Sequence, residues 1–464
     1  MLTTPVTDRS TPTGSLGWRV ALGVFAVVAV VHTLSPSVQV GDSRLSVPVA
    51  TQVVRHHSLD LSKNALVSAL TNKYDVRTVD GRLLPFFPWP AMLFATPGVV
   101  VADVVGVDPA ALRPSNPNRT WEIEVPVAST LVALTAVILA VIAFDFVPGE
   151  LRSRRRSAAL IALAYAFTTG AWSTGSRALW QHTPSMLLLA LALLAARRLD
   201  RHRLWGVALG MALAGAFAVR PTNALAVACF AVWVLVATRR SIRRVAIGMA
   251  IVVVPFVAVN LASYHAILPT YYSGNRLQTE MAIGFFDSLG MFLVSPSRSV
   301  FIYDPLVIAA IAGVWLQRRR RLLTPLDLTV CAVVVGQLTV VSRYGSTGGS
   351  SYGPRLMTDV LPFVVYLAIP AFVAVFAGGV RAGAAGGRRV FVVAMLVILG
   401  WGALVNASGA LLRSSYCWSA RPVHVDLKPS RIWDWSDPQF FRPVKDLFDG
   451  ASLHDVVLES CSAT

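Results

Sequence analysis

Asp42 is the first residue in this sequence whose type and position could support catalysis. It stands in Gly41-Asp42-Ser43-Arg44, a few residues after the first long apolar segment ends. A carboxylate at a membrane rim is partly desolvated and can act as a general base. The alternative is a helix N-cap, because an Asp before an apolar-periodic run serves that role equally well. On the residue pattern alone, the N-cap is the more common outcome.

Four cationic residues further along the chain could bind an anionic group. They are His182, which follows Trp180 in Ser176-Arg177-Ala178-Leu179-Trp180-Gln181-His182, and Arg220, Arg298 and Arg355. Several arginines at one membrane face can make bidentate contacts to a phosphate. For His182 and Trp180 the alternative is an aromatic belt at the membrane interface. For the arginines it is ion pairing with protein carboxylates, of which the candidates are Glu122, Asp287, Asp304 and Asp359.

Membrane helices must position these residues. The chain has 464 residues, of which 55% are hydrophobic and only 14% charged, and its mean hydropathy is +0.61. Soluble chains carry roughly 25% charged residues. Several uncharged stretches here reach the roughly 20 residues that cross a bilayer. The composition excludes a cytosolic enzyme, a secreted disulfide scaffold and a disordered protein, and it predicts an all-α polytopic membrane protein.

About eleven transmembrane helices are expected, and this odd number places the N-terminus inside and the C-terminus outside. Arginine-rich clusters occupy every second loop, as the positive-inside rule predicts. These clusters account for nearly all of the net charge of +17, so no nucleic-acid partner is needed to explain it. The spans cover residues 18–36, 125–147, 157–174, 183–197, 204–220, 223–238, 245–263, 299–317, 324–342, 359–378 and 389–411.

Three regions follow from this division. Residues 1–17 form a polar cytoplasmic lead that we expect to be disordered, residues 18–411 the transmembrane domain, and residues 412–464 an extracytoplasmic tail. The domain includes a long first outer loop, 37–124, which should carry short surface helices. Within it, 86–107 is apolar enough to span but contains three prolines and Asp103, so we interpret it as a surface or re-entrant element.

The cysteines divide between the spans and the tail. Cys229 and Cys331 lie in predicted spans and are most simply packing residues. Cys417 and Cys461 are the only two in the predicted outer tail, where an oxidising environment favours a disulfide between them. No spacing of His and Cys suggests a zinc site.

Eight motifs together resemble bacterial membrane glycosyltransferases of the GT-C class, related to protein O-mannosyltransferases and lipid A aminoarabinose transferases. They run in the expected order from about residue 30 to 442. The motifs are GDSRLSV, RHHSLDL, FPWPAMLFATP, SRALWQHTP, RPTN, FLVSPSRSVFIYDP, GGSSYGPRLMTDVLPF and WDWSDPQF.

The resemblance implies a GT-C-like fold, a polyprenyl-phosphate-linked sugar donor and an inverting transfer at the outer face of the bacterial plasma membrane. It also implies that an acid in the first outer loop, here Asp42, is the general base. The Asp-Glu pair of the mannosyltransferases is missing, because Ser43 follows Asp42. No cofactor is therefore assigned, and a requirement for Mg²⁺ or Mn²⁺ stays open.

The remaining site residues are assigned to the donor phosphate and to other contacts with the substrate. We expect the donor phosphate to bind Arg220 and Arg355, with Arg298 and His182 as weaker candidates. Other contacts to the substrate are expected from Arg44, Trp180 and Tyr352.

The expected function is transfer of a hexosyl or pentosyl group to a glycan, lipid or protein acceptor. The Ala-, Val- and Arg-rich composition suggests a high-GC bacterium, for which decaprenyl-phospho-arabinose and polyprenyl-phospho-mannose are the donors to test. A transporter or flippase of a lipid-linked sugar is the alternative, as is a non-catalytic protein of cell-envelope assembly. A transporter should carry intramembrane charges or inverted repeats, whereas the polar residues here gather at the outer rim, which favours an enzyme.

Overall fold

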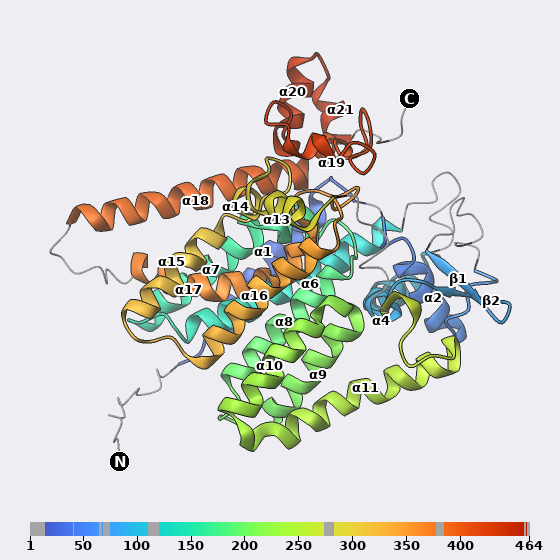
Figure 1. Cartoon of the computed structure of the whole chain (residues 1–464), viewed down its shortest axis with the longest axis horizontal. Coiled ribbons are helices and arrows are strands. Elements are labelled where there is room, and N and C mark those ends of the chain that lie inside the picture. Colours follow the sequence, from blue (N-terminus) through green and yellow to red (C-terminus); the bar gives the residue numbers. More distant parts are fainter. Residues whose placement is uncertain are drawn as a thin grey trace.

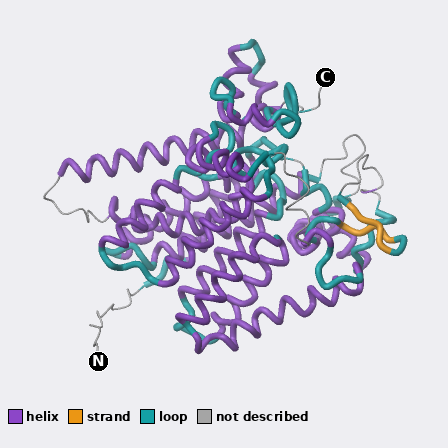
Figure 2. The backbone as a smooth tube through the Cα atoms, in the orientation of Figure 1, coloured by secondary structure: helices purple, strands orange, loops and turns teal. Residues whose placement is uncertain are grey.

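The computed structural model describes residues 14–39, 41–64, 67, 75–109, 120–272, 283–376, 385–458 and 461. Most of the polar lead, residues 1–13, lies outside this part of the chain. The described residues form a bundle of long helices, with a small unit at one side and another at one end (Figure 1). Helix dominates, and the two short strands stand apart from the bundle (Figure 2).

Each of the eleven segments predicted to span a membrane overlaps one of the helices of the described chain, and the number of eleven spans stays a prediction. Five helices in the described chain are long and apolar enough to cross a membrane, among them α6, whose 24 residues extend roughly 36 Å at 1.5 Å per residue. The chain is therefore a multi-pass membrane protein. The helices are α1 (Trp18–Leu34), α6 (Trp121–Phe144), α7 (Leu151–Thr168), α8 (His182–Arg197), α9 (Leu204–Val219), α10 (Ala224–Ala237), α11 (Ile242–Tyr264), α15 (Leu306–Arg319), α16 (Pro325–Arg343), α17 (Leu361–Phe376) and α18 (Ala385–Leu411).

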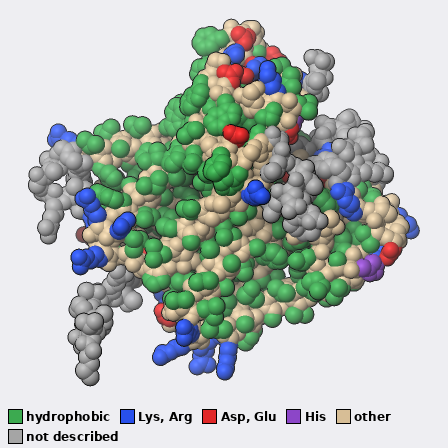
Figure 3. Space-filling view, viewed as in Figure 1, with side chains coloured by type: hydrophobic (Ala, Val, Ile, Leu, Met, Phe, Trp, Pro, Cys, Tyr) green, Lys and Arg blue, Asp and Glu red, His purple; other side chains and the backbone are tan. Residues whose placement is uncertain are grey.

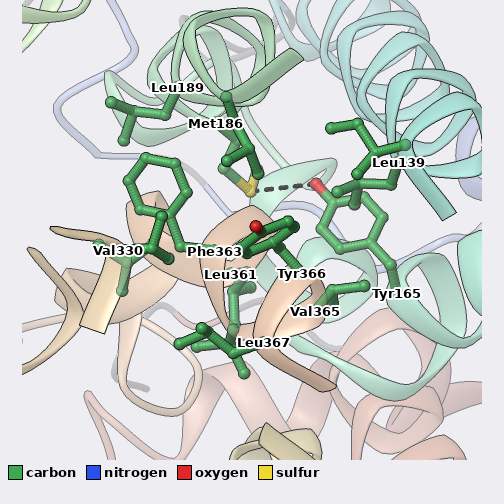
Figure 4. Close-up of a cluster of buried hydrophobic side chains, with 14 of the residues drawn as sticks. Leu139, Tyr165, Met186, Leu189, Val330, Leu361, Phe363, Val365, Tyr366 and Leu367 are labelled. Atoms are coloured by element: carbon green, nitrogen blue, oxygen red, sulfur yellow. Dashed lines mark hydrogen bonds between the residues drawn. The ribbon is translucent and has the colours of Figure 1, made fainter. Parts of the chain in front are cut away.

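The bundle is centred on α6, which packs against α1, α7, α8 and α17. Aliphatic and aromatic side chains from several helices interlock in its core, where the Tyr165 hydroxyl lies 3.3 Å from the Met186 sulfur (Figure 4). Helices α9 and α11 approach more closely still. A Cβ atom on Gly210 would lie 2.0 Å from the Val245 carbonyl oxygen, so only glycine allows this contact between the two backbones.

A small unit built from the described part of the predicted first outer loop, 37–124, lies beside the bundle. It contains α2 (Ser46–His56), α4 (Trp89–Met92), the 3-10 turn η1 (Leu93–Ala95), α5 (Thr96–Val104) and a β-hairpin. Strands β1 (Val76–Val79) and β2 (Arg82–Pro85) pair antiparallel, with Val76 opposite Pro85 and Val79 opposite Arg82. The short helices agree with the expectation, but the hairpin was not predicted. Its turn is Asp80-Gly81, both with positive φ, which is the strongest short-range hairpin signal.

The ambiguous stretch 86–107 belongs to this unit. Its helical pieces α4, η1 and α5 pack against α2. Arg55 of α2 pairs with Asp103 at 2.6 Å and with Asp108 at 3.1 Å. Helix α2, which precedes the stretch in the chain, therefore lies beside the C-terminal end of the stretch and the residue just after it. Such proximity favours a surface or re-entrant element over a crossing of roughly 30 Å.

The C-terminal tail forms the unit at the top of Figure 1. It comprises α19 (Arg413–Cys417), the 3-10 turns η8 (Pro429–Trp433) and η9 (Gln439–Phe441), α20 (Arg442–Phe448) and α21 (Leu453–Leu458). Cys417 and Cys461 are joined by a disulfide. Cys229 and Cys331 are free and half-buried in α10 and α16.

Charge is distributed unevenly around the bundle. Figure 3 shows hydrophobic side chains covering its sides, with Lys and Arg gathered at the left and lower edges. The lower group lies by the connection between α10 and α11, where Arg239, Arg240 and Arg243 are exposed. This apolar belt with a basic edge is typical of a membrane protein.

Candidate active site

Four segments far apart in the sequence converge at the end of the bundle opposite this basic edge. The first is the turn 41–45 that follows α1. The second is the segment 176–182, which follows the π-helical turn η2 (Ala171–Gly175) and leads into α8. The others are the end of α9 at Arg220 and the 3-10 turn η6 (Arg355–Val360), which leads into α17. Together they bring five of the predicted residues into one region: Asp42, Trp180, His182, Arg220 and Arg355.

Asp42 faces Arg355. Its Oδ2 lies 3.5 Å from Nη1 of Arg355, and the two side chains are 35% and 13% exposed. The alternative role of Asp42 as a helix N-cap is wrong, because α2 begins at Ser46 and its N-cap residue is Leu45. The carboxylate therefore lies at a partly solvated rim beside a cation.

Trp180 organises this pair. The Arg355 guanidinium carbon lies 4.3 Å from the centre of the Trp180 ring, a cation–π contact that fixes its plane. Gly41 packs on the same ring, since a Cβ there would lie 2.9 Å from Cη2 of Trp180. One buried tryptophan thus holds both the turn that carries Asp42 and the side chain that faces it. The Trp180 side chain is buried, so we interpret it as a support beneath the Asp42–Arg355 pair.

Arg220 and His182 both contact the buried carboxylate of Asp359. Nε of Arg220 lies 2.6 Å from Oδ2 of Asp359, and Nδ1 of His182 lies 3.2 Å from Oδ1. Nη1 of Arg220 also lies 3.2 Å from Nε2 of His182. The structure therefore gives Arg220 the protein carboxylate that was its alternative partner. Both His182 ring nitrogens are engaged, so His182 is poorly placed to bind a donor phosphate.

Two other predicted residues have buried polar contacts within the protein. Arg298 is fully buried. It donates hydrogen bonds to the side chains of Gln439 and Ser419 in the tail and to the carbonyls of Thr347 and Gly349 in the loop before η6. A further hydrogen bond goes to the carbonyl of its neighbour Ser297. The Tyr352 hydroxyl donates to the Val405 carbonyl at 2.6 Å inside the protein. The structure thus engages these polar atoms within the protein, and the roles of Arg298 in binding phosphate and of Tyr352 in binding substrate stay predictions. Their polar atoms are used to join η6 and the tail to the bundle.

Arg44 also has a protein partner. Its Nη2 lies 2.9 Å from Oδ2 of the buried Asp75, at the start of the hairpin. This contact joins the Asp42 turn to the outer-loop unit. A structural role accounts for it without a substrate.

Three polar residues that sequence reasoning did not assign lie at or beside the site. Gln181 Nε2 donates to the Tyr271 hydroxyl at 3.1 Å, next to Asp42 and Arg220. Burial raises the pKa of the Tyr271 phenol, the Arg220 guanidinium lowers it in part, and the Asp42 carboxylate raises it further. Glu124, at the buried start of α6, accepts hydrogen bonds from Ser43 and from the Leu179 amide, the latter at 3.3 Å. The only available signal was the position of these residues near predicted span ends.

The described residues contain no group of three or more His, Cys, Asp or Glu side chains that could hold a metal ion. Ser43, rather than a second acid, follows Asp42 in the sequence. No residue set is therefore assigned to Mg²⁺ or Mn²⁺.

Comparison with known proteins identifies the fold. No family model and no curated protein matches the chain. Among solved structures, the oligosaccharyltransferase of Archaeoglobus fulgidus, tethered with an acceptor peptide containing the NVT sequon, matches with a TM-score of 0.50 at 12% sequence identity. That match covers 89% of this chain and 58% of the other. The chain has a GT-C fold.

Structures of ArnT from Cupriavidus metallidurans are also similar. The form bound to undecaprenyl phosphate has a TM-score of 0.49 and 17% identity, covering 88% of this chain and 70% of that one. The apo form has a TM-score of 0.47 and 15% identity, covering 87% and 68%. At such identities the likeness concerns the fold alone, and the GT-C fold expected from the motifs is confirmed by the oligosaccharyltransferase match.

Proposed function

We propose that this protein is an inverting glycosyltransferase. It moves a sugar from a polyprenyl-phosphate donor to a glycan, lipid or protein acceptor at the outer face of the bacterial plasma membrane, with its N-terminus in the cytoplasm. The observation that carries the proposal is the juxtaposition of Asp42 and Arg355 at the ends of membrane helices. The GT-C fold shared with an oligosaccharyltransferase supports the same reaction class.

Each member of the pair has one role in the transfer. Asp42 accepts the proton of the acceptor hydroxyl as that oxygen bonds to the anomeric carbon. The bond from the anomeric carbon to the phosphate oxygen breaks, and its electron pair leaves with the phosphate. Arg355 stabilises the negative charge that develops there, so the leaving group needs no proton. Attack opposite the leaving group inverts the anomeric centre, as in inverting glycosidases.

This geometry requires the sugar to lie between the base and the phosphate. In this structure the two side chains contact each other, at 3.5 Å. Both are partly exposed, and such ion pairs contribute only about 0.2–1 kcal/mol. Donor binding therefore exchanges the Asp42 carboxylate for phosphate at Arg355, at small cost. Trp180 keeps the guanidinium in place during the exchange.

The buried cluster of Arg220, His182 and Asp359 supports η6 from below. Asp359 lies one turn after Arg355 in the same 3-10 element, and its carboxylate is anchored to α8 and α9 through the other two residues. Arg355 is thus our main phosphate ligand. We assign Arg220 the role of fixing η6 and adding positive potential.

An apolar hollow offers room for the lipid part of the donor. It measures about 300 Å³ and is lined by α15, α16 and α17. Its lining also includes Met357 and Val360 of η6, the element that begins with Arg355. A donor with its phosphate at Arg355 can therefore place its isoprenoid chain among membrane helices.

The proposal is tested by turnover. Purified protein in nanodiscs is supplied with a panel of polyprenyl-phosphate sugars, including decaprenyl-phospho-arabinose and polyprenyl-phospho-mannose, and with extracts containing acceptors. Release of polyprenyl phosphate, followed by mass spectrometry, should occur with at least one donor. Movement of an intact donor across the bilayer without its consumption would identify a flippase instead.

A further inference from the structure

Arg177 is a fully buried cation beside the site. Its Nη1 donates to the carbonyl of Ser35 at 2.6 Å and to that of Ser37 at 3.3 Å, and its Nη2 donates to the carbonyl of His32. Nε and Nη2 also contact the Ser176 hydroxyl. No described carboxylate lies near it, and burial alone lowers the pKa of Arg177 to about 9.

A buried cation without an acidic partner is costly, so its acceptors must explain its presence. The three carbonyls belong to the last turn of α1 and the residues that follow it. A helix C-terminus leaves carbonyls unpaired and carries partial negative charge. Arg177 supplies both the hydrogen bonds and the opposite charge that this end of α1 lacks.

The same segment holds the chain on both sides of Asp42. Before it, the Gln39 amide donates to the Arg177 carbonyl at 3.1 Å, and the Gln39 side chain donates to the Ser173 carbonyl at 2.5 Å. After it, the Ser46 hydroxyl donates to the Leu179 carbonyl at 3.3 Å. Asp42 therefore sits in a short arch whose two ends are fastened to residues 173–179.

We propose that Arg177 is a positioning residue for Asp42. By fastening the end of α1 to the segment that carries Trp180, it holds the Asp42 carboxylate at the distance from the sugar that proton transfer requires. This inference rests on the proposed function. It assigns no contact between Arg177 and the substrate.

The first test compares Arg177→Met with Arg154→Met. Arg154 is a matched control, because it is also buried and donates to the Phe144 carbonyl at the C-terminus of α6, but at the basic end of the bundle. A misplacement of about 1 Å can lower a rate by about 100-fold. We expect Arg177→Met to lower kcat by about that factor with donor KM within twofold of wild type. Arg154→Met should lower activity only in proportion to its folded fraction.

A double-mutant cycle separates positioning from stability. If Arg177 acts through Asp42, Arg177→Met should have no further effect on the residual turnover of Asp42→Asn. Independent losses that multiply would overturn the inference, as would equal losses per folded molecule in Arg177→Met and Arg154→Met. An active Asp42→Asn would overturn the proposed base itself, so the two failures are distinguishable.

If Arg177→Met does not fold, Arg177→Lys provides the alternative test. Lysine keeps the charge but not the planar fork, so we expect a loss in kcat of about three- to tenfold at unchanged donor KM. That loss should also vanish in the Asp42→Asn background. Wild-type kcat in Arg177→Lys would overturn the inference.

Discussion

Oδ2 of Asp42 lies 3.5 Å from Nη1 of Arg355, although 313 positions separate the two residues in the chain. The proposed base and the proposed ligand of the leaving group therefore contact each other in this structure. Because the sugar must come between them, donor phosphate and Asp42 compete for the same guanidinium. This relationship makes separate predictions for the two residues.

Replacing Arg355 should weaken donor use. Loss of a charge-assisted contact costs about 1.5–3 kcal/mol, so Arg355→Ala should raise donor KM or lower turnover by tens-fold. Arg355→Lys should restore little, because an ammonium cannot stack as a plane on Trp180. Initial rates over a donor series measure both effects. Arg442→Ala, which removes an arginine paired with Asp446 on α20, is the control, and normal donor kinetics in Arg355→Ala would make Arg355 structural.

A single added methyl group tests the packing beneath the pair. Gly41→Ala would place a Cβ 2.9 Å from Trp180, so the ring or the Asp42 turn must shift. We expect kcat to fall by roughly ten- to 100-fold, since sub-ångström placement matters for proton transfer. Gly23→Ala, on α1 with nothing within 4 Å of the added atom, should behave as wild type. Equal activity of both variants would show that the Trp180 contact is irrelevant to the reaction.

The topology can be read by cysteine labelling in whole cells. Ser62→Cys lies before the stretch 86–107 and Val107→Cys at its last residue, and both should react with a membrane-impermeant maleimide, as should Ser452→Cys in the tail. Asp200→Cys, in a basic loop, should react only after permeabilisation. The reason is the positive-inside distribution of arginine together with the pairing of Arg55 with Asp103 and Asp108. Labelling at only one of positions 62 and 107 would mean that 86–107 crosses the membrane.

The disulfide should restrain the tail and leave the bundle unaffected. Closing the 44-position separation between Cys417 and Cys461 is worth about 3–4 kcal/mol in the chain-entropy model. The double variant Cys417→Ser/Cys461→Ser should therefore expose the tail to limited proteolysis while the bundle keeps its resistance. Non-reduced digests of the wild-type protein should contain the linked peptide pair. Two free thiols in that sample would contradict the pairing.

Local patterns were sufficient to predict the helices but not the contacts between distant segments. All eleven apolar segments are helical, because hydrophobic length is a local property. The Asp80-Gly81 turn was a readable hairpin signal that the all-α expectation overlooked. Whether Arg298 or Arg220 is available to a ligand depends on acceptors many positions away, such as Thr347 and Asp359. No spacing rule reports such acceptors.

The difference between local patterns and long-range contacts also explains which site residues were predicted and which were missed. Asp42 and Arg355 were predicted as site residues because each stands near a predicted span end, and the resemblance to GT-C enzymes favoured Asp42 as the base. Tyr271 and Glu124 were missed, since a lone tyrosine or a glutamate beside a span has many ordinary roles. Only the fold shows that they adjoin Asp42 and Ser43.

The most direct test of the account is donor turnover by Asp42→Asn. Asparagine keeps the shape of the side chain but cannot accept the acceptor's proton, and a positioned base contributes about 10²–10⁴-fold. We predict that turnover falls by that factor while expression and thermal stability stay near wild type and donor KM does not rise. Asp80→Asn, in the exposed hairpin turn, should keep full activity. An Asp42→Asn protein that consumes the donor at the wild-type rate would contradict the central claim.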